Sequence, residues 1–258
     1  MHPDILPTIQ SIESNDGVRV FYCCESGSRA WGFPSRDSDY DARFLYVHPP
    51  DWYFSLNVER KPEVIERPIS ADLDLNGWDL RKALTLLRKS NPPLIEWLQS
   101  PIVYLDKSGV AERLRALLPE FYSPALSRYH YLHMARGNYR EYLQGDTVWI
   151  KKYFYVLRPL LAILWIEQDR GAVPTEFGKL VEATVDSPKL KTAIGELVLR
   201  KMSGEELDEG PRIPVISDFI AAQMARLENV TVPLRENKGD LDTLNSVFRW
   251  AVRRVWNV

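Results

Sequence analysis

The spacing of hydrophobic residues changes along this chain and divides it into two parts. Up to about residue 105, short runs of β-branched and aromatic residues predict strands; beyond Gly109, apolar residues recur every three or four positions, as in amphipathic helices. The expected strands are 18–24, 39–47, 63–67, 72–78 and 102–105. The expected helices of the second part are 110–118, 124–144, 147–168, 176–184, 188–202, 213–227 and 241–255.

Short helices are also expected among the strands. They cover residues 1–16, 29–32, 80–89 and 94–99, and Asp79 supplies the N-cap of the third. This order of elements predicts an α+β fold. We expect a first domain at residues 1–110, with a small mixed sheet and flanking helices, followed by an all-helical domain at residues 111–258.

Composition narrows the class of protein. Of the 258 residues, 45% are hydrophobic and 26% are charged, and no apolar run approaches the length of a membrane span. The N-terminal sequence lacks the basic and apolar regions of a signal peptide, so we expect a cytoplasmic protein. Cys23 and Cys24 are adjacent on a predicted strand, cannot readily bridge each other, and suit a reducing compartment. The net charge of −2 excludes a globally basic nucleic-acid binder, so any RNA contact must come from local patches.

The most informative stretch is GSRAWGFPSRDSDYD, which begins at Gly27. Side chains alternate between the two faces of a strand, so Asp39, Asp41 and Arg43 share one face. Neighbouring carboxylates repel each other, and a divalent cation between them relieves that repulsion. The turn formed by Gly27 and Ser28 offers backbone N–H groups and a hydroxyl, which suit a triphosphate. The pattern predicts a site for Mg²⁺, or for Mn²⁺, beside a nucleoside triphosphate.

A Gly-Ser pair, a spacer of about ten residues and Asp-x-Asp on a strand resemble the signature of the DNA polymerase β nucleotidyltransferase superfamily. The matching positions are Gly27, Ser28, Asp39 and Asp41. The strings GSRAWGFPSRDSDYDARFLYV, GWDLRKAL and KSNPPLIEWLQSPIVY are similar to one branch, the nucleotidyltransferases of the YcgL/RlaP type, named for an RNA-repair pathway. The resemblance is strong over residues 25–104 and looser beyond. It implies that the first domain is a polymerase-beta-like nucleotidyltransferase domain.

The resemblance implies a two-metal reaction that moves an NMP from a nucleoside triphosphate to an acceptor hydroxyl and releases pyrophosphate. Asp39 and Asp41 would hold the metal, together with a third carboxylate on a later strand. We expect Asp74 in that role, because it lies in mid-strand between two leucines. Asp72 is the alternative on the same face, whereas Asp79 is more simply an N-cap.

Gly27, Ser28, Arg29 and Arg36 are the expected triphosphate-binding residues of the first domain. Ser28 would bind phosphate through its hydroxyl, although it could equally be an N-cap. The two arginines flank the expected phosphate site and could each hold a phosphate oxygen. Arg43 either orients the aspartates or forms a structural ion pair with them.

The sequence from Lys151 to Arg158 opens a long helix of the second part. In related two-domain nucleotidyltransferases, helices of this domain supply basic and aromatic contacts to the triphosphate and the base. By that resemblance, Lys152, Tyr155 and Arg158 are expected to bind the nucleotide. A helix with a solvated basic edge is the alternative.

Basic and aromatic residues also mix near the C-terminus. Such a mixture can contact a nucleic-acid backbone and stack on bases, although a terminal helix with a solvated basic face is the commoner explanation. The residues are Arg249, Trp250, Arg253, Arg254 and Trp256.

The sequence leaves the acceptor open. An RNA or tRNA 3′ end follows only from the name of the family that the chain resembles. A protein or a small molecule could instead accept the nucleotide, or the fold could serve as a non-catalytic nucleotide-binding module. Retention of both Asp39 and Asp41 counts against the last alternative. The identity of the nucleotide and the oligomeric state also stay open.

Overall fold

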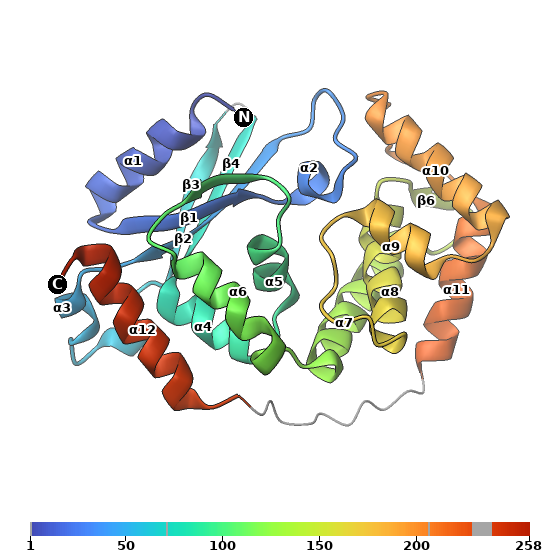
Figure 1. Ribbon diagram of the computed structural model, residues 1–258. Coiled ribbons are helices and arrows are strands. Elements are labelled where there is room, and N and C mark those ends of the chain that lie inside the picture. The colour runs from blue at the N-terminus through green and yellow to red at the C-terminus, as the bar shows by residue number, and fades with distance from the viewer. Residues whose placement is uncertain (1, 71, 206, 229–238) are drawn as a thin grey trace. The chain divides into compact units, whose positions relative to one another are not determined.

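The computed structural model describes residues 2–70, 72–205, 207–228 and 239–258 (Figure 1). The chain forms two compact units, and both are discontinuous in sequence. The first unit comprises Met1–Ala30, Asp39–Tyr122 and Asn237–Val258, and the second comprises Trp31–Ser38 and Ser123–Glu236. This division differs from a single boundary at residues 110/111, because two later segments belong with the sheet and one early segment belongs with the helices.

A five-stranded mixed sheet organises the first unit, so the α+β prediction is confirmed. The strand order is β3-β4-β2-β1-β5, in which β2 and β4 are parallel and the other neighbouring pairs are antiparallel. All five predicted strands are present, with ends shifted by up to three residues. They are β1 (Arg19–Glu25), β2 (Tyr40–Val47), β3 (Val64–Ser70), β4 (Leu73–Asp79) and β5 (Val103–Asp106).

Helices cover both faces of this sheet (Figure 1). On one face lies α1 (Ile5–Asp16), whose residues Ile5, Ile9 and Ile12 recur at helical spacing and pack on buried residues of β1, β2 and β4. The helices of the opposite face are α4 (Leu80–Arg88), α5 (Pro92–Leu98), α6 (Val110–Phe121) and α12 (Leu241–Trp256). Shorter elements are α2 (Gly27–Trp31), α3 (Pro50–Tyr53) and the 3-10 helix η1 (Val58–Arg60).

The second unit is built around α8 (Lys152–Glu167), in which 11 residues are buried. The helices α7 (Pro124–Tyr142), α9 (Phe177–Thr184), α10 (Pro188–Met202) and α11 (Pro214–Glu228) complete its helical part. One helix prediction is wrong at its start, because residues 147–149 form the short strand β6 (Thr147–Trp149). This strand pairs with β7 (Glu209–Pro211), about 60 residues later in the chain, and such a distant partner leaves no local signal in the sequence. No described helix has the length and apolar character that a membrane crossing requires.

Candidate active site

Two aspartates meet because β2 and β4 are parallel neighbours. The strand register places Asp41 beside Asp74, and both residues are the second of their strands. Side chains at paired positions of neighbouring strands point to the same face. The carboxylates therefore lie next to each other on one face of the sheet, although they are 33 positions apart in the sequence.

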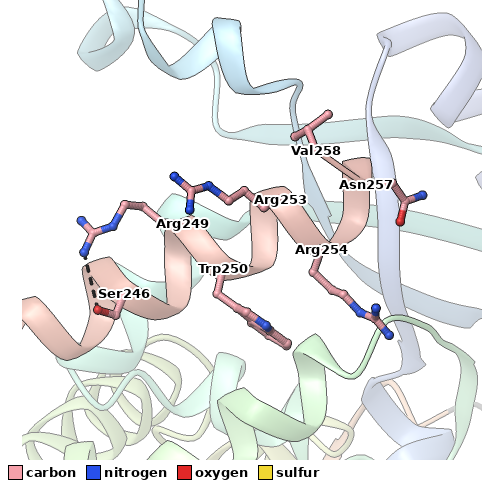
Figure 2. Close-up of a pocket in the computed structure, with 7 residues that line it drawn as sticks. All are labelled: Ser246, Arg249, Trp250, Arg253, Arg254, Asn257 and Val258. Carbon is pink, nitrogen blue, oxygen red and sulfur yellow. Dashed lines mark hydrogen bonds between the residues drawn. The ribbon is translucent and has the colours of Figure 1, made fainter.

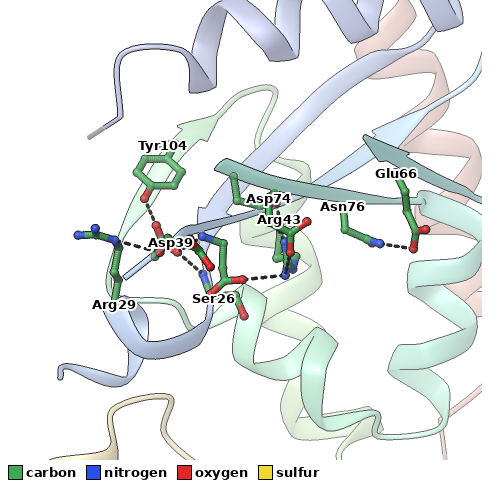
Figure 3. Close-up of polar contacts among 11 residues, drawn as sticks. Ser26, Arg29, Asp39, Arg43, Glu66, Asp74, Asn76 and Tyr104 are labelled. Carbon is green, nitrogen blue, oxygen red and sulfur yellow. Dashed lines mark hydrogen bonds and ion pairs between the residues drawn. The ribbon is translucent and has the colours of Figure 1, made fainter. Parts of the chain in front are cut away.

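Arg43 joins the two carboxylates (Figure 3). Its Nη2 atom donates to Asp41 Oδ1 at 3.0 Å and to Asp74 Oδ2 at 2.7 Å. Its Nη1 atom donates to the carbonyl oxygens of Asp74 at 3.1 Å and Ala42 at 3.2 Å. The guanidinium both orients the aspartates and neutralises part of their charge, so the two roles considered for Arg43 are combined in one arrangement.

The surroundings of Asp41 raise the pKa of its carboxyl. Burial raises the pKa of the Asp41 carboxyl, Arg43 lowers it, and the charges of Asp74 and Asp39 raise it again, with a net upward shift. A cation at this position would reverse the balance, because a positive charge stabilises the carboxylate.

Gly27 borders the same carboxylate. Its φ is +60°, and a Cβ atom on it would lie 2.0 Å from Asp41 Oδ2, closer than real atoms approach. Ser26, the residue before Gly27, bonds directly to the Asp41 backbone: its N–H donates to the Asp41 carbonyl at 2.9 Å. The sequence predicts that Gly27 adopts a backbone conformation, or a closeness to phosphate, that a side chain would obstruct. Its positive φ agrees with the first alternative, and the Asp41 carboxylate occupies the space that a side chain on residue 27 would need.

Glu25 and Tyr104 also support this turn, and the sequence-based reasoning missed both. Glu25 is fully buried, and its Oε1 accepts from the N–H groups of Asp41 at 2.7 Å and Ser26 at 3.3 Å. Its other oxygen accepts from the Tyr104 hydroxyl (Figure 3). Burial raises the pKa of Glu25, and the hydrogen bonds from Tyr104 and the Asp41 backbone oppose that rise. A glutamate at the end of an otherwise apolar strand, just before Gly27, is the signal that could have identified it.

The family model described as "RlaP: RNA repair pathway DNA polymerase beta family" matches residues 1–250. The chain belongs to the RlaP family. The uncharacterised protein YcgL of Bacillus subtilis (strain 168) is 49% identical over 257 residues, which cover 99% of this chain and 98% of that protein.

A solved structure is also similar, at a lower level. The crystal structure of a nucleotidyltransferase-like protein from Exiguobacterium sibiricum 255-15 shares 11% identity and a TM-score of 0.33, over 86% of this chain and 74% of that chain. We base no argument on this weak likeness. Membership of the RlaP family, together with the mixed α+β fold, points to a nucleotidyltransferase of the polymerase-beta type.

Within this RlaP-family site, the remaining residues of the Gly27–Asp41 motif have distinct environments. Asp39 immediately precedes β2 and is exposed, and its carbonyl accepts from Arg29 Nε at 3.2 Å. The Arg29 guanidinium also lies over the Tyr40 ring, 3.7 Å from its centroid. Ser28 is half-buried in α2. Tyr40 alone separates Asp39 from Asp41 in the chain, and Arg29 is held against the Asp39 backbone.

The two alternatives for the third carboxylate have other partners. Asp72 lies 3.0 Å from His2 Nε2, and its side chain is 48% exposed. Asp79 is fully buried at the N-cap of α4, where it accepts from the Arg81 N–H at 2.8 Å and from the Tyr53 hydroxyl at 2.6 Å. Of the three aspartates considered, Asp74 is the one that lies beside Asp41.

The other expected nucleotide-binding residues belong to the second unit. Arg36 is exposed there, and the Lys152 ammonium lies over the rings of Tyr142 and Tyr155, at 4.0 and 5.0 Å. Arg158 is only 2% exposed; its guanidinium donates to the Thr175 carbonyl at 3.3 Å and lies over the ring of Trp31.

The burial of Arg158 changes what we infer for it. Its position in α8 points the side chain into the helical core, where it bonds to backbone carbonyls of a loop. Such contacts are typical of an arginine that holds a loop in place, and phosphate binding by Arg158 would require this buried side chain to leave them. Lys152 and Tyr155 reach the surface of the unit and stay candidates.

The carboxylates fit a metal of the magnesium type. In the described ranges, no group of three or more His, Cys, Asp or Glu side chains could hold a metal ion, so these residues form no all-protein metal cage. Mg²⁺ seldom uses such a cage, because it usually takes one or two protein carboxylates together with substrate phosphates and water. Asp41 and Asp74 place two carboxylates next to each other on one face of the sheet, which is the number of protein ligands that Mg²⁺ commonly takes.

Proposed function

We propose that the protein transfers a nucleoside monophosphate from a nucleoside triphosphate to the 3′ hydroxyl of an RNA. The acceptor oxygen would form a bond to the α-phosphorus, and the bond from that phosphorus to pyrophosphate would break. The observation that carries the proposal is the pairing of Asp41 with Asp74 beside Gly27, in a chain of the RNA repair pathway DNA polymerase beta family. The family description is what favours RNA over other acceptors.

Asp39, Asp41 and Asp74 would hold Mg²⁺, which when bound activates the hydroxyl and neutralises charge on the phosphates. The protein's own residues organise these ligands. Arg43 fixes the carboxylates of Asp41 and Asp74 in one orientation. Because ligands that are already placed need no reorganisation during the reaction, most of the rate enhancement would come from positioning and charge.

Behind the ligands, Gly27 leaves the space that the Asp41 carboxylate occupies, and Glu25 holds the Asp41 backbone through a hydrogen bond of 2.7 Å. Neither residue needs to touch the substrate. Both would act by keeping one metal ligand in position, so their replacement would weaken binding of the metal–triphosphate complex before it changed the chemical step.

The test is incubation of the protein with each labelled triphosphate, Mg²⁺ and total cellular RNA, followed by separation on a gel. Asp41→Asn and Asp74→Asn should each lower labelling by a factor of about 100 or more, because each removes a charged metal ligand. Asp72→Asn is the matched control: it changes the same residue type two positions from Asp74 and should retain activity. Equal activity in all three variants would refute the site.

Digestion of the labelled product identifies the acceptor. A label that ribonuclease releases and protease leaves intact supports the RNA acceptor. A label that only protease releases would instead make the protein a nucleotidyltransferase that modifies proteins, with the same carboxylates at its centre.

A further inference from the structure

The first unit also has a surface pocket outside the carboxylate site, on the exposed side of α12. A pocket of about 500 Å³ opens there (Figure 2). Its lining residues are Ser246, Arg249, Trp250, Arg253, Arg254, Asn257 and Val258. Figure 2 shows Arg249 and Arg253 on one side of the helix, and Trp250 and Arg254 on the other. Arginine and tryptophan thus supply most of the large side chains of this pocket.

Two further arginines reach the same helix from other elements. Arg113 of α6 lies over the Trp250 ring, 4.7 Å from its centroid, and Arg19 of β1 lies 5.1 Å from the centroid of Trp256. We call the whole set the arginine–tryptophan surface. It comprises Arg19, Arg113, Arg249, Arg253, Arg254, Trp250 and Trp256.

The five arginines are exposed, and in the described part of the chain none forms an ion pair with a carboxylate. The protein as a whole has a net charge of −2, and many of its other arginines are paired. These paired arginines include Arg43, Arg67, Arg81, Arg115, Arg128, Arg200 and Arg226. The surface therefore gathers arginines without carboxylate partners among the described residues, on a mildly acidic protein.

Helix stabilisation explains only some of the arginines in the arginine–tryptophan surface. Arg253 and Arg254 lie in the last turn of α12, where a positive charge stabilises the negative end of the helix dipole. That effect does not extend to Arg249, which lies farther from the helix end, or to the arginines that come from β1 and α6. Positive charge from three separate elements, combined with tryptophan rings, is the composition of a surface that binds phosphates and stacks on bases.

The surface lies at the far end of the sheet from the carboxylates. Arg19 begins β1 opposite Val47, whereas Glu25 ends β1 opposite Ala42, next to Asp41. Six residues of strand at about 3.3 Å each separate these ends by roughly 20 Å. A triphosphate bound at the carboxylates could not extend that far, but a polynucleotide strand of about six nucleotides or more could, at about 3.4 Å per nucleotide.

We propose that the arginine–tryptophan surface binds single-stranded RNA at a distance from the 3′ end on which the enzyme acts. The proposal rests on the proposed function in taking RNA as the polymer. The arginines contact phosphates, and the partly exposed tryptophans stack on unpaired bases. The surface thus makes the enzyme prefer acceptors long enough to reach it.

The binding experiment uses the full chain and a labelled single-stranded RNA of about 24 nucleotides, four times the span estimated above. Fluorescence anisotropy should show that the double variant Arg249→Ala/Arg253→Ala binds at least about tenfold more weakly than the unmodified protein. A plot of the logarithm of the variant's RNA-binding constant against the logarithm of the salt concentration should also be shallower, by about 1.4 in slope. Each phosphate contact to a single strand contributes about 0.7 to that slope, and the variant loses two. Both side chains are exposed, so the fold should not change.

The matched control is Arg60→Ala/Lys89→Ala, which removes the same charge from exposed positions of the same unit outside the surface. It should bind RNA as the unmodified protein does. If the two double variants have equal affinity for RNA, the proposal is overturned. It is also overturned if an RNA duplex binds as tightly as the single strand, because paired bases cannot stack on the tryptophans.

Acceptor length separates this proposal from the proposed function. With a dinucleotide acceptor, which is too short to reach from the carboxylates to the arginine–tryptophan surface, the Arg249→Ala/Arg253→Ala variant should transfer as well as the unmodified protein. With the long acceptor its KM should rise about tenfold at unchanged kcat. RNA binding through this surface without labelling of RNA would refute the proposed function alone. Labelling of RNA with unchanged binding in the variant would refute the surface alone.

Discussion

Among single residues, Arg43 is the one that allows two neighbouring carboxylates to be accommodated in the folded chain. Asp41 and Asp74 approach each other through strand pairing, and burial makes the ionised form of Asp41 costly. The guanidinium between them supplies the positive charge that two adjacent carboxylates need. Arg43 therefore provides in the protein itself part of the stabilisation that a bound cation would give.

Arg43→Ala should make the stability of the protein depend on metal. Without the guanidinium the two carboxylates repel each other, so in the presence of EDTA unfolding should become easier by about 1–3 kcal/mol. Millimolar Mg²⁺ should restore part of this loss in the variant and change the unmodified protein less. Thermal unfolding with EDTA and with Mg²⁺ measures both effects.

Arg67→Ala is the control for this prediction, because it breaks a single ion pair, with Asp16, in the same unit. It should show no larger Mg²⁺ effect than the unmodified protein. If Arg43→Ala responds to Mg²⁺ no more than Arg67→Ala does, the carboxylates do not attract a cation and the metal site is wrong.

Among the secondary-structure elements, β4 and α4 are joined at Asp79, which has two structural roles. Asp79 ends the strand and caps the helix, and it does so while fully buried beside the Tyr53 hydroxyl. Burial raises the pKa of Asp79 to about 6, although the bonds from Tyr53 and the Arg81 N–H oppose the rise. The helix cap therefore titrates at a higher pH than an exposed aspartate would.

This pKa predicts the direction of a pH effect on stability. In the unfolded chain Asp79 loses its proton near pH 4, whereas in the folded chain it keeps the proton to about pH 6. The folded state binds more protons between these values, so the contribution of Asp79 to stability falls as pH rises from 4 to 6 and is constant above. The total change is on the order of 3 kcal/mol.

Asp79→Asn isolates this contribution, because the amide oxygen can still accept from the Arg81 N–H but does not titrate. Urea unfolding at pH 4, 5, 6 and 7, spanning the titration of about 4 to 6, should show the variant gaining stability relative to the unmodified protein as pH rises. His48 works in the opposite direction, because burial lowers its pKa to about 4, but both proteins carry it and its effect cancels. Parallel curves for the two proteins would contradict the raised pKa.

In the molecule as a whole, segments that are far apart in the sequence belong to the same compact unit. Helix α12 follows the segments of the second unit, yet it belongs to the sheet-containing unit and packs on α4 and β1. Its residues Leu244, Val247 and Val252 are buried. A shortened chain that ends near Asp106 would lack both α6 and α12, so it would lose part of its own core and could not report on nucleotide binding alone.

Leu244→Ala tests this assignment. Leu244 is buried, so its truncation should lower the free energy of unfolding by about 2–5 kcal/mol. Leu241→Ala on the same helix is the matched control, because Leu241 is 49% exposed and its truncation should cost no more than about 0.5 kcal/mol. Urea unfolding of both variants provides the measurement. Equal losses would mean that α12 is not docked on the sheet as the structure describes.

Local patterns in the amino-acid sequence were enough to predict most secondary-structure elements and the family. Alternating and helical spacing of apolar residues located the five strands of the sheet and the major helices, because burial of one face imposes that spacing locally. The Gly27–Asp41 motif identified the family for a similar reason, since its residues lie close together in the chain. The exceptions are β6 and β7, two three-residue strands that pair with each other although they lie far apart in the sequence.

Contacts between residues far apart in the sequence could not be predicted and became known from the fold. The parallel register of β2 and β4 selected Asp74 as the neighbour of Asp41, although Asp72 has the same residue type and the same strand periodicity. Folding likewise buried Arg158, brought Glu25 under the Asp41 backbone, and gathered arginines from β1, α6 and α12 on one surface. Spacing within a segment reports which face a residue occupies, but the partner across that face depends on strand order and helix docking, which involve the whole chain.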